Sequence, residues 1–260
     1  MNTETLRRIV VKVGTSSLTH PTGSLHLRNM DKLVRTISDL KNEGYQIILV
    51  TSGAIGVGMS KLGMKTRPED LRLKQAAAAV GQCELMHIYD KFFLDYGTVC
   101  GQILFTHDDI DSVSRRESLV NTLEAMLEVG AIPVINENDA VGVEEILFGD
   151  NDSLSAEVAV LARADLLVLF SDIDGLYDKD PHKNPDAKII PRVTEVTDAL
   201  YSLAGGAGTK LGTGGMTTKL HAAEIAMKQT IPMVITNGTR FEALYDIVDG
   251  VISGTLFERA

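Results

Sequence analysis

The segment from Gln46 to Gly58 reads Q-I-I-L-V-T-S-G-A-I-G-V-G and contains the pattern that decides the fold. Its first part, Gln46–Thr51, is a continuous apolar run, which is typical of a parallel strand covered by helices on both faces. The second part places three glycines where a strand passes into a helix, and glycine lets a backbone approach a ligand closely there. Such glycines also serve plain helix–sheet packing, so they alone do not decide between the two roles.

The rest of the chain repeats this alternation of short β-branched runs with longer amphipathic segments. We expect strands at Ile9–Val13, Gln46–Thr51, Val99–Phe105, Ile132–Ile135, Asp165–Phe170 and Pro232–Thr236, and helices at Leu27–Glu43, Leu71–Tyr96, Arg115–Val129, Asn151–Arg163 and Met216–Gln229. This order predicts an α/β fold with a mainly parallel sheet and helices on both faces. Residues Ile173–Val196 hold three of the seven prolines and are expected to form a loop with short strands. No repeat or linker-like break occurs, so residues 1–260 are expected to form a single domain.

Composition and charge narrow the class of protein. The 260 residues have a net charge of -10, which repels nucleic acid and anionic membranes at long range. Cys83 and Cys100 form no C-x-x-C pair and the histidines form no H-E-x-x-H, so we expect reduced thiols and no structural metal site. Arg7 and Arg8 precede only a short apolar run, and no stretch has the length of a transmembrane helix. These features predict a cytoplasmic protein without nucleic-acid or membrane partners.

Two segments at opposite ends of the chain have the composition of phosphate-binding loops. Ligands of open parallel sheets bind beyond the carboxyl ends of the strands, and Lys12 stands at the end of the first expected strand, followed by Gly14. The alternative for Lys12 is an edge lysine that reaches solvent. The second segment, Gly205–Lys219, holds six glycines and runs into a helix with Lys219 in its first turn. The alternative for this segment is a flexible surface loop.

Acidic and amide side chains follow two further strands. Asn136–Asp139 comes directly after one strand, and Gly149–Asp152 opens a helix. We expect these side chains to converge on the ammonium group of an amino acid and to position the lysines, although Asp150 or Asn151 could also be simple helix caps. The turn Ser171–Gly175 does not fit a calcium loop, and it is better interpreted as a nucleotide-contacting turn.

The standard phosphate signatures are absent, because the chain has no Walker A sequence, no G-x-G-x-x-G and no D-F-G. Six other segments, in this order, resemble the amino-acid kinase family, and within it the members that phosphorylate L-glutamate. They are V-V-K-V-G-T-S-S-L (10–18), V-T-S-G-A-I-G-V-G (50–58), I-N-E-N-D (135–139), F-G-D-N-D-S-L-S-A (148–156), S-D-I-D-G-L-Y (171–177) and G-T-G-G-M-T-T-K (212–219). The resemblance covers essentially the whole chain.

The resemblance implies a three-layer αβα sandwich and the transfer of phosphate from ATP to the γ-carboxylate of L-glutamate, which gives γ-glutamyl phosphate in the first step of proline synthesis. It implies that Lys12 and Lys219 stabilise the transferring phosphoryl group, that Asp152 holds both lysines, and that Mg²⁺ is carried mainly by the phosphates of ATP, with no metal ligand from the protein. The glutamate-binding residues would be Ser52, Asp139 and Asn151. The ATP-binding residues would be Lys12, Ser171, Asp172, Thr213, Gly214, Gly215, Met216, Thr217, Thr218 and Lys219.

Further properties follow from the same resemblance. It implies a homo-oligomer, a dimer or a tetramer, with feedback inhibition by proline. Many members carry a C-terminal PUA domain, and this chain ends at Ala260, where that domain would begin, so a short form is expected. Two alternatives stay open. The chain could be an N-acetylglutamate or aspartate kinase of the same fold, or an amino-acid sensor that has lost turnover.

Overall fold

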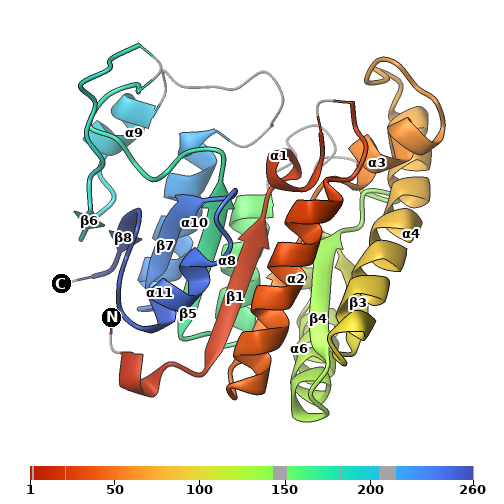
Figure 1. Cartoon of the computed structure of the whole chain (residues 1–260), viewed down its shortest axis with the longest axis horizontal. Coiled ribbons are helices and arrows are strands. Elements are labelled where there is room, and N and C mark those ends of the chain that lie inside the picture. Colours follow the sequence, from red (N-terminus) through yellow and green to blue (C-terminus); the bar gives the residue numbers. More distant parts are fainter. Residues whose placement is uncertain (2, 21, 143–150, 182, 205–214, 260) are drawn as a thin grey trace.

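The computed structural model describes all residues except 2, 21, 143–150, 182, 205–214 and 260. A single sheet runs through the middle of the molecule, and helices cover both of its faces (Figure 1). This three-layer αβα arrangement confirms the α/β fold predicted from alternating strands and helices. No helix in the described part of the chain is both long enough and apolar enough to span a membrane.

The described residues place eight strands in the sheet, in the order β3-β4-β2-β1-β5-β7-β8-β6. All neighbouring strands are parallel except β7 and β8. The central strand β1 lies between β2 and β5, with Lys12 in register with Val50 and Leu169, so the loops after these strands meet at one edge. The strands are β1 (Arg8–Val13), β2 (Gln46–Val50), β3 (Cys100–Phe105), β4 (Ile132–Glu137), β5 (Leu166–Ser171), β6 (Arg192–Val193), β7 (Met233–Asn237) and β8 (Thr255–Phe257).

The larger helices form two layers, each over its own apolar core. The cores alternate along β1, where Val10 belongs to one and Val11 to the other, as expected for a strand buried on both faces. α2, α4 and α11 pack over the core of Val11, and α6, α8 and α10 pack over the core of Val10. The helices are α1 (Thr15–Leu18), α2 (Leu27–Asn42), α3 (Ala54–Lys61), α4 (Leu71–Asp95), α5 (His107–Asp111), α6 (Val113–Glu128), α8 (Asn151–Leu161), α9 (Asp198–Ala204), α10 (Met216–Lys228), α11 (Ala243–Val248) and the 3-10 turn η1 (Thr3–Thr5).

The expected elements are all present, and their ends shift by at most two residues. β4 continues through Asn136 and Glu137, and β5 through Ser171, so three polar residues that we expected after strands lie inside them. The loop predicted at Ile173–Val196 contains the two-residue strand β6 and an isolated bridge between Tyr177 and Ile189. The predicted elements did not include β8, which is only three residues long and pairs with β7 in antiparallel register.

Two glycines allow α3 and α4 to cross in close contact. A Cβ atom built on Gly58 would lie 1.7 Å from the carbonyl oxygen of Ala77, and one built on Gly81 would lie 1.7 Å from that of Ala54. The backbones therefore approach to a distance that no other residue permits. α4 contains a run of four alanines at residues 76–79. Ala77 and Ala78 are buried, so this part of the run serves contact within the core. The crossing fixes α4 against the loop that follows β2.

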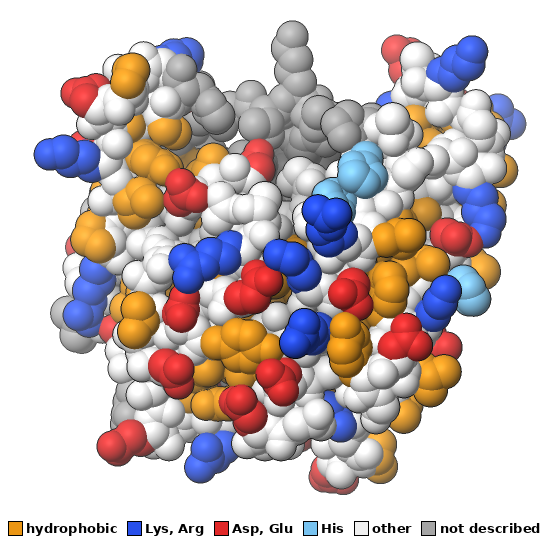
Figure 2. All heavy atoms as spheres, viewed as in Figure 1, with side chains coloured by type: hydrophobic (Ala, Val, Ile, Leu, Met, Phe, Trp, Pro, Cys, Tyr) orange, Lys and Arg blue, Asp and Glu red, His pale blue; other side chains and the backbone are white. Residues whose placement is uncertain are grey.

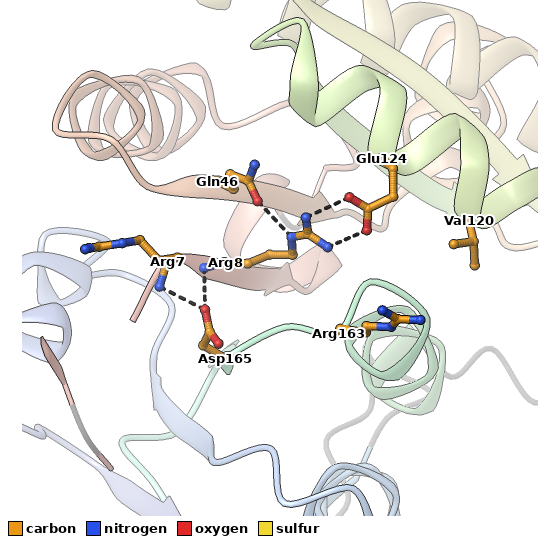
Figure 3. A pocket seen from close by; sticks show the side chains of 7 residues that line it. All are labelled: Arg7, Arg8, Gln46, Val120, Glu124, Arg163 and Asp165. Atoms are coloured by element: carbon orange, nitrogen blue, oxygen red, sulfur yellow. Dashed lines mark hydrogen bonds and ion pairs between the residues drawn. The ribbon is translucent and has the colours of Figure 1, made fainter. Parts of the chain in front are cut away.

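The opposite edge of the sheet, where the parallel strands begin, is held by an ionic network (Figure 3). The guanidinium of Arg8 donates to both carboxylate oxygens of Glu124 and to Oε1 of Gln46, and the backbone N–H groups of Arg7 and Arg8 donate to one oxygen of Asp165. These contacts line a cavity of about 480 Å³ and join β1, β2, α6 and the segment before β5. The network is structural, because it lies at the end of the sheet away from the predicted ligand loops.

Candidate functional site

Lys12 lies in the central strand β1 and is only 7% exposed. Side chains alternate across a strand, so Lys12 shares its face with Val10, which packs in the core beneath α8 and α10. The ammonium group therefore points into the helix layer. A central, buried position excludes the alternative of an edge lysine that reaches solvent.

Asp152, in the first turn of α8, joins Lys12 to Lys219. The Nζ atom of Lys12 lies 2.6 Å from Oδ1 of Asp152, and the Nζ atom of Lys219 lies 3.0 Å from Oδ2. The hydroxyl of Thr218 lies 2.8 Å from the same Oδ2 and 2.8 Å from the carbonyl oxygen of Gly215. Asp152 is 1% exposed and Lys219 is 6% exposed. Residues from the two ends of the chain thus form one buried cluster of two cations and one carboxylate.

The cluster keeps Asp152 ionised. Burial disfavours the charged form of this carboxyl group, but the charges of Lys12 and Lys219 and their hydrogen bonds outweigh burial and hold the pKa of Asp152 well below its usual range. The cluster is therefore a fixed pair of cations on a permanent anion, with positive charge in excess. Figure 2 shows Lys and Arg intermixed with Asp and Glu over the face of α2, so charges of both signs alternate on this surface. The two cations of the site differ from these surface charges because Lys12 and Lys219 are buried.

Backbone N–H groups at the start of α10 lie next to these cations. Gly215 is the N-cap of α10, and the first N–H groups of a helix have no partner within the helix, which suits them to phosphate. A Cβ atom on Gly14 would lie 3.6 Å from Nζ of Lys12, so glycine leaves the space beside that ammonium open. Met216 is buried and Thr217 is exposed in the first turn of α10. Thr213 and Gly214, which we predicted to bind ATP, lie outside the described residues.

A second cluster, of amide and hydroxyl groups, is centred on Asn151. Its Nδ2 atom lies 2.6 Å from the carbonyl oxygen of Thr51, 2.8 Å from Oγ of Ser52 and 2.8 Å from Oδ1 of Asn136. Loops and strand ends at β2 and β4 thereby meet at the start of α8, and the structure brings together Ser52 and Asn151, two residues that the resemblance implies bind glutamate. Asn151 and Asp152 are consecutive, so the amide cluster and the lysine cluster are neighbours.

Two residues of α4 that the sequence did not point to support the amide cluster. Oε1 of Gln82 accepts a hydrogen bond of 2.8 Å from Nδ2 of Asn136, and the hydroxyl of Tyr89 lies 2.8 Å from Oγ1 of Thr51. Gln82 and Tyr89 are seven residues apart, which places them on one face of the helix. The only signal in the sequence was a glutamine within a run of small and apolar residues.

The remaining predicted site residues lie at the same edge of the sheet. Ser171 is the last residue of β5, beside the end of β1, and its hydroxyl donates to Oδ1 of the exposed Asp172 over 3.1 Å. The backbone N–H of Gly238 donates to the carbonyl oxygen of Ser171, so the segment after β7 closes on this turn. Asp139 is half-buried, two residues beyond the end of β4. Among the described residues, no group of three His, Cys, Asp or Glu side chains is arranged to hold a metal ion.

Comparison with known proteins places this geometry in a family. The model of the amino acid kinase family matches residues 7–237. A protein named glutamate 5-kinase from Clostridium acetobutylicum is 54% identical over 252 residues, which cover 97% of this chain and 94% of the relative. A glutamate 5-kinase from Listeria innocua is 51% identical over 255 residues, which cover 96% of this chain and 92% of the relative.

Solved structures share the fold at much lower identity. A carbamate kinase from Giardia lamblia bound to AMP-PNP has a TM-score of 0.71 and 14% identity, and the match covers 98% of this chain and 99% of that one. A UMP kinase from Ureaplasma parvum has a TM-score of 0.67 and 15% identity over the same shares of the two chains. At such identities the likeness concerns the arrangement of helices and strands alone.

Proposed function

The chain belongs to the amino acid kinase family, and from this premise we propose that it transfers the γ-phosphoryl group of ATP to the γ-carboxylate of L-glutamate. The product, γ-glutamyl phosphate, is the first intermediate of proline synthesis. Relatives named glutamate 5-kinase, more than half identical over nearly the whole chain, support this activity. The structural observation that supports the proposal is the adjacency of Asn151 and Asp152, which brings the amide cluster beside two buried lysines.

The chemistry of the reaction matches the cluster. A carboxylate acceptor is already ionised at neutral pH, so no strong general base is needed. The demands are to bring two anions together in line and to stabilise the charge on the transferring group. Lys12 and Lys219 meet both demands, because Asp152 holds their ammonium groups at fixed positions before the substrates bind.

The proposed division of the site follows the two clusters. Ser52, Asp139 and Asn151 bind glutamate at the end of β2, beyond β4 and at the start of α8. Lys12, Lys219 and Asp152 act at the transferring phosphoryl group between the two substrates. The ATP-binding residues are Lys12, Ser171, Asp172, Gly215, Met216, Thr217, Thr218 and Lys219, together with Thr213 and Gly214.

Mg²⁺ fits this arrangement as a partner of the nucleotide. The oxygens of Asp152 already accept hydrogen bonds from Lys12 and Lys219, so this carboxylate is committed to the lysines. Phosphate oxygens of ATP would therefore supply most of the ligands, which is usual for Mg²⁺ in kinases. When bound, the ion neutralises part of the phosphate charge.

Trapping of the acyl phosphate with hydroxylamine tests the proposed substrate. The purified protein is given ATP, Mg²⁺ and either L-glutamate, L-aspartate or N-acetyl-L-glutamate, and the hydroxamate formed is measured. The proposal predicts the highest kcat/KM with L-glutamate. Faster reaction with either other acceptor would contradict it and favour another kinase of the same fold. Binding of glutamate without any turnover would favour a sensor.

The wider setting of the enzyme belongs to the same proposal. We place it in the cytoplasm, as a dimer or tetramer of one-domain chains that proline inhibits. Light scattering measures the mass of the assembly, and the trapping assay repeated with proline measures the inhibition.

A further inference from the structure

Gln82 is a buried polar residue that accepts one hydrogen bond from the amide cluster. It lies on the inner face of α4 and is 8% exposed, and its Oε1 atom accepts the 2.8 Å hydrogen bond from Nδ2 of Asn136, which is 2% exposed. Its own Nε2 atom is buried and has no hydrogen-bond partner among the described residues. Gln82 therefore serves the site through its oxygen alone.

The backbone fixes the direction of this hydrogen bond. The N–H of Glu137 lies 3.0 Å from Oδ1 of Asn136, and a backbone N–H can only donate. The oxygen of the Asn136 amide must then face Glu137, and its NH₂ group must face Gln82. Gln82 has to present an acceptor in return, so neither amide can be turned over without losing a bond.

The orientation of the Asn136 amide also determines how Asn151 is hydrogen-bonded. Its NH₂ group has two hydrogens and three oxygen atoms within reach, on Thr51, Ser52 and Asn136. The carbonyl oxygen of Thr51 and Oδ1 of Asn136 can only accept, whereas the hydroxyl of Ser52 can also donate. Both hydrogens of Asn151 are thus best donated to the two oxygens that can only accept. Within the described part of the chain the Oδ1 atom of Asn151 accepts no hydrogen bond, so it can accept one from a ligand, and the hydroxyl hydrogen of Ser52 is left to be donated.

We propose that Gln82 is a positioning residue, which acts through Asn136 to hold the carbonyl oxygen of Asn151 toward the ammonium group of the amino-acid substrate. The inference rests on the proposed function, since it assumes that this pocket takes the amino acid. Without an acceptor at position 82, the NH₂ group of Asn136 is buried without a partner. Asn136 then turns to find one and withdraws Oδ1 from Asn151.

Steady-state kinetics of Gln82→Met and Gln82→Glu test the role. The methionine side chain in the first variant is similar in length to glutamine but has no acceptor of comparable strength. The glutamate side chain in the second variant keeps an acceptor oxygen at position 82. For Gln82→Met we expect KM for L-glutamate to rise about tenfold, the effect of one buried polar group left unpaired. KM for ATP should stay within about twofold. The Ki of glutarate, which has both carboxylates but no ammonium group, should change by less than about threefold.

Two variants control this comparison. Gln82→Glu should keep KM for L-glutamate within about threefold of the parent value, because Asn136 retains its partner. Gln46→Met makes the same chemical change at a glutamine that accepts from Arg8 at the opposite edge of the sheet, and it should leave every kinetic constant unchanged. Circular dichroism and the unfolding midpoint of each variant identify any that fails to fold, and Gln82→Glu then decides by itself.

The inference is overturned if Gln82→Met binds L-glutamate as the parent does, if it weakens glutarate and glutamate equally, or if Gln82→Glu is as impaired as Gln82→Met. A parent protein that prefers aspartate would overturn the proposed function alone, since aspartate has the same ammonium group and the comparison can be repeated with it. A parent that prefers N-acetylglutamate, which has no ammonium group, would overturn both.

Discussion

Lys12 and Lys219 come from opposite ends of the chain and bind opposite oxygens of one buried carboxylate, that of Asp152. β1 supplies the first lysine at the centre of the sheet, and the first turn of α10 supplies the second. Two like charges at this separation repel each other in a protein interior, and Asp152 compensates the repulsion. The fold thus builds a pair of fixed cations where a phosphoryl group would pass.

Replacement of Asp152 by asparagine should destabilise the protein in a way that depends on pH. At neutral pH the variant leaves two buried ammonium groups without their anion, which we expect to cost about 3–5 kcal/mol in the free energy of unfolding. The folded-state pKa of Asp152 is depressed, so its contribution is complete above the unfolded-state pKa, about 4, and is lost as the pH falls below that value. Urea unfolding of parent and variant at several pH values from about 3 to about 7, a range that spans the unfolded-state pKa, measures the difference.

The matched control is Asp186→Asn, which removes an exposed carboxylate that pairs with Lys179 on the surface. It should change the free energy of unfolding by less than about 1 kcal/mol at any pH. A loss in Asp152→Asn that stays constant as the pH falls would contradict the account of the cluster.

Tyr89→Phe should weaken the binding of glutamate through Thr51. The hydroxyl of Tyr89 is the partner of the buried Thr51 hydroxyl, and the carbonyl of Thr51 holds Asn151. Removing the Tyr89 hydroxyl should lower the free energy of unfolding by about 1–2 kcal/mol, because the buried Thr51 hydroxyl loses its partner. We expect KM for L-glutamate to rise by about threefold to tenfold with little change in KM for ATP. Equal changes in the two KM values would show that the contact acts on the whole fold and has no particular link to this pocket.

Gly81→Ala should separate α3 from α4. The new methyl group would lie 1.7 Å from the carbonyl oxygen of Ala54, so one helix must move. We expect a loss of at least about 2 kcal/mol in the free energy of unfolding, as for other overpacked cores. Gly56→Ala is the control in α3, because its methyl group would meet nothing within 4 Å, and it should stabilise the helix by about 0.5–1 kcal/mol. Thermal unfolding of both variants checks this, and equal stability of the two would contradict the close crossing.

The layers of the fold were predictable from the sequence because strands and helices have local signatures, and Lys12 stood out as well, whereas the link from Lys12 and Lys219 to Asp152 was implied only by the family resemblance and is seen here as two ion pairs. Apolar runs and helical spacing mark the elements, and a lysine inside a buried strand is unusual enough to stand out. The parallel topology then brings the strand ends together.

Other features depend on partners far away in the chain and left no local mark. From the sequence alone, Gln82 is one polar residue in a long helix. Its role depends on a hydrogen bond with Asn136, which lies 54 positions later in the chain. The strand β8 has three residues and exists only through its pairing with β7. The polarity of the amide cluster depends on one backbone N–H, that of Glu137, whose direction no residue type encodes.

The most direct test of the central claim is the turnover of Lys219→Met with saturating ATP and L-glutamate, beside Lys228→Met as control. Both lysines belong to α10, but Lys219 is buried on Asp152 and Lys228 is exposed in the last turn. If Lys219 stabilises the transferring phosphoryl group, kcat for hydroxamate formation should fall by about 10²–10³ in the first variant. It should stay at the parent value in the second. A Lys219→Met protein that folds and retains the parent kcat would contradict the account.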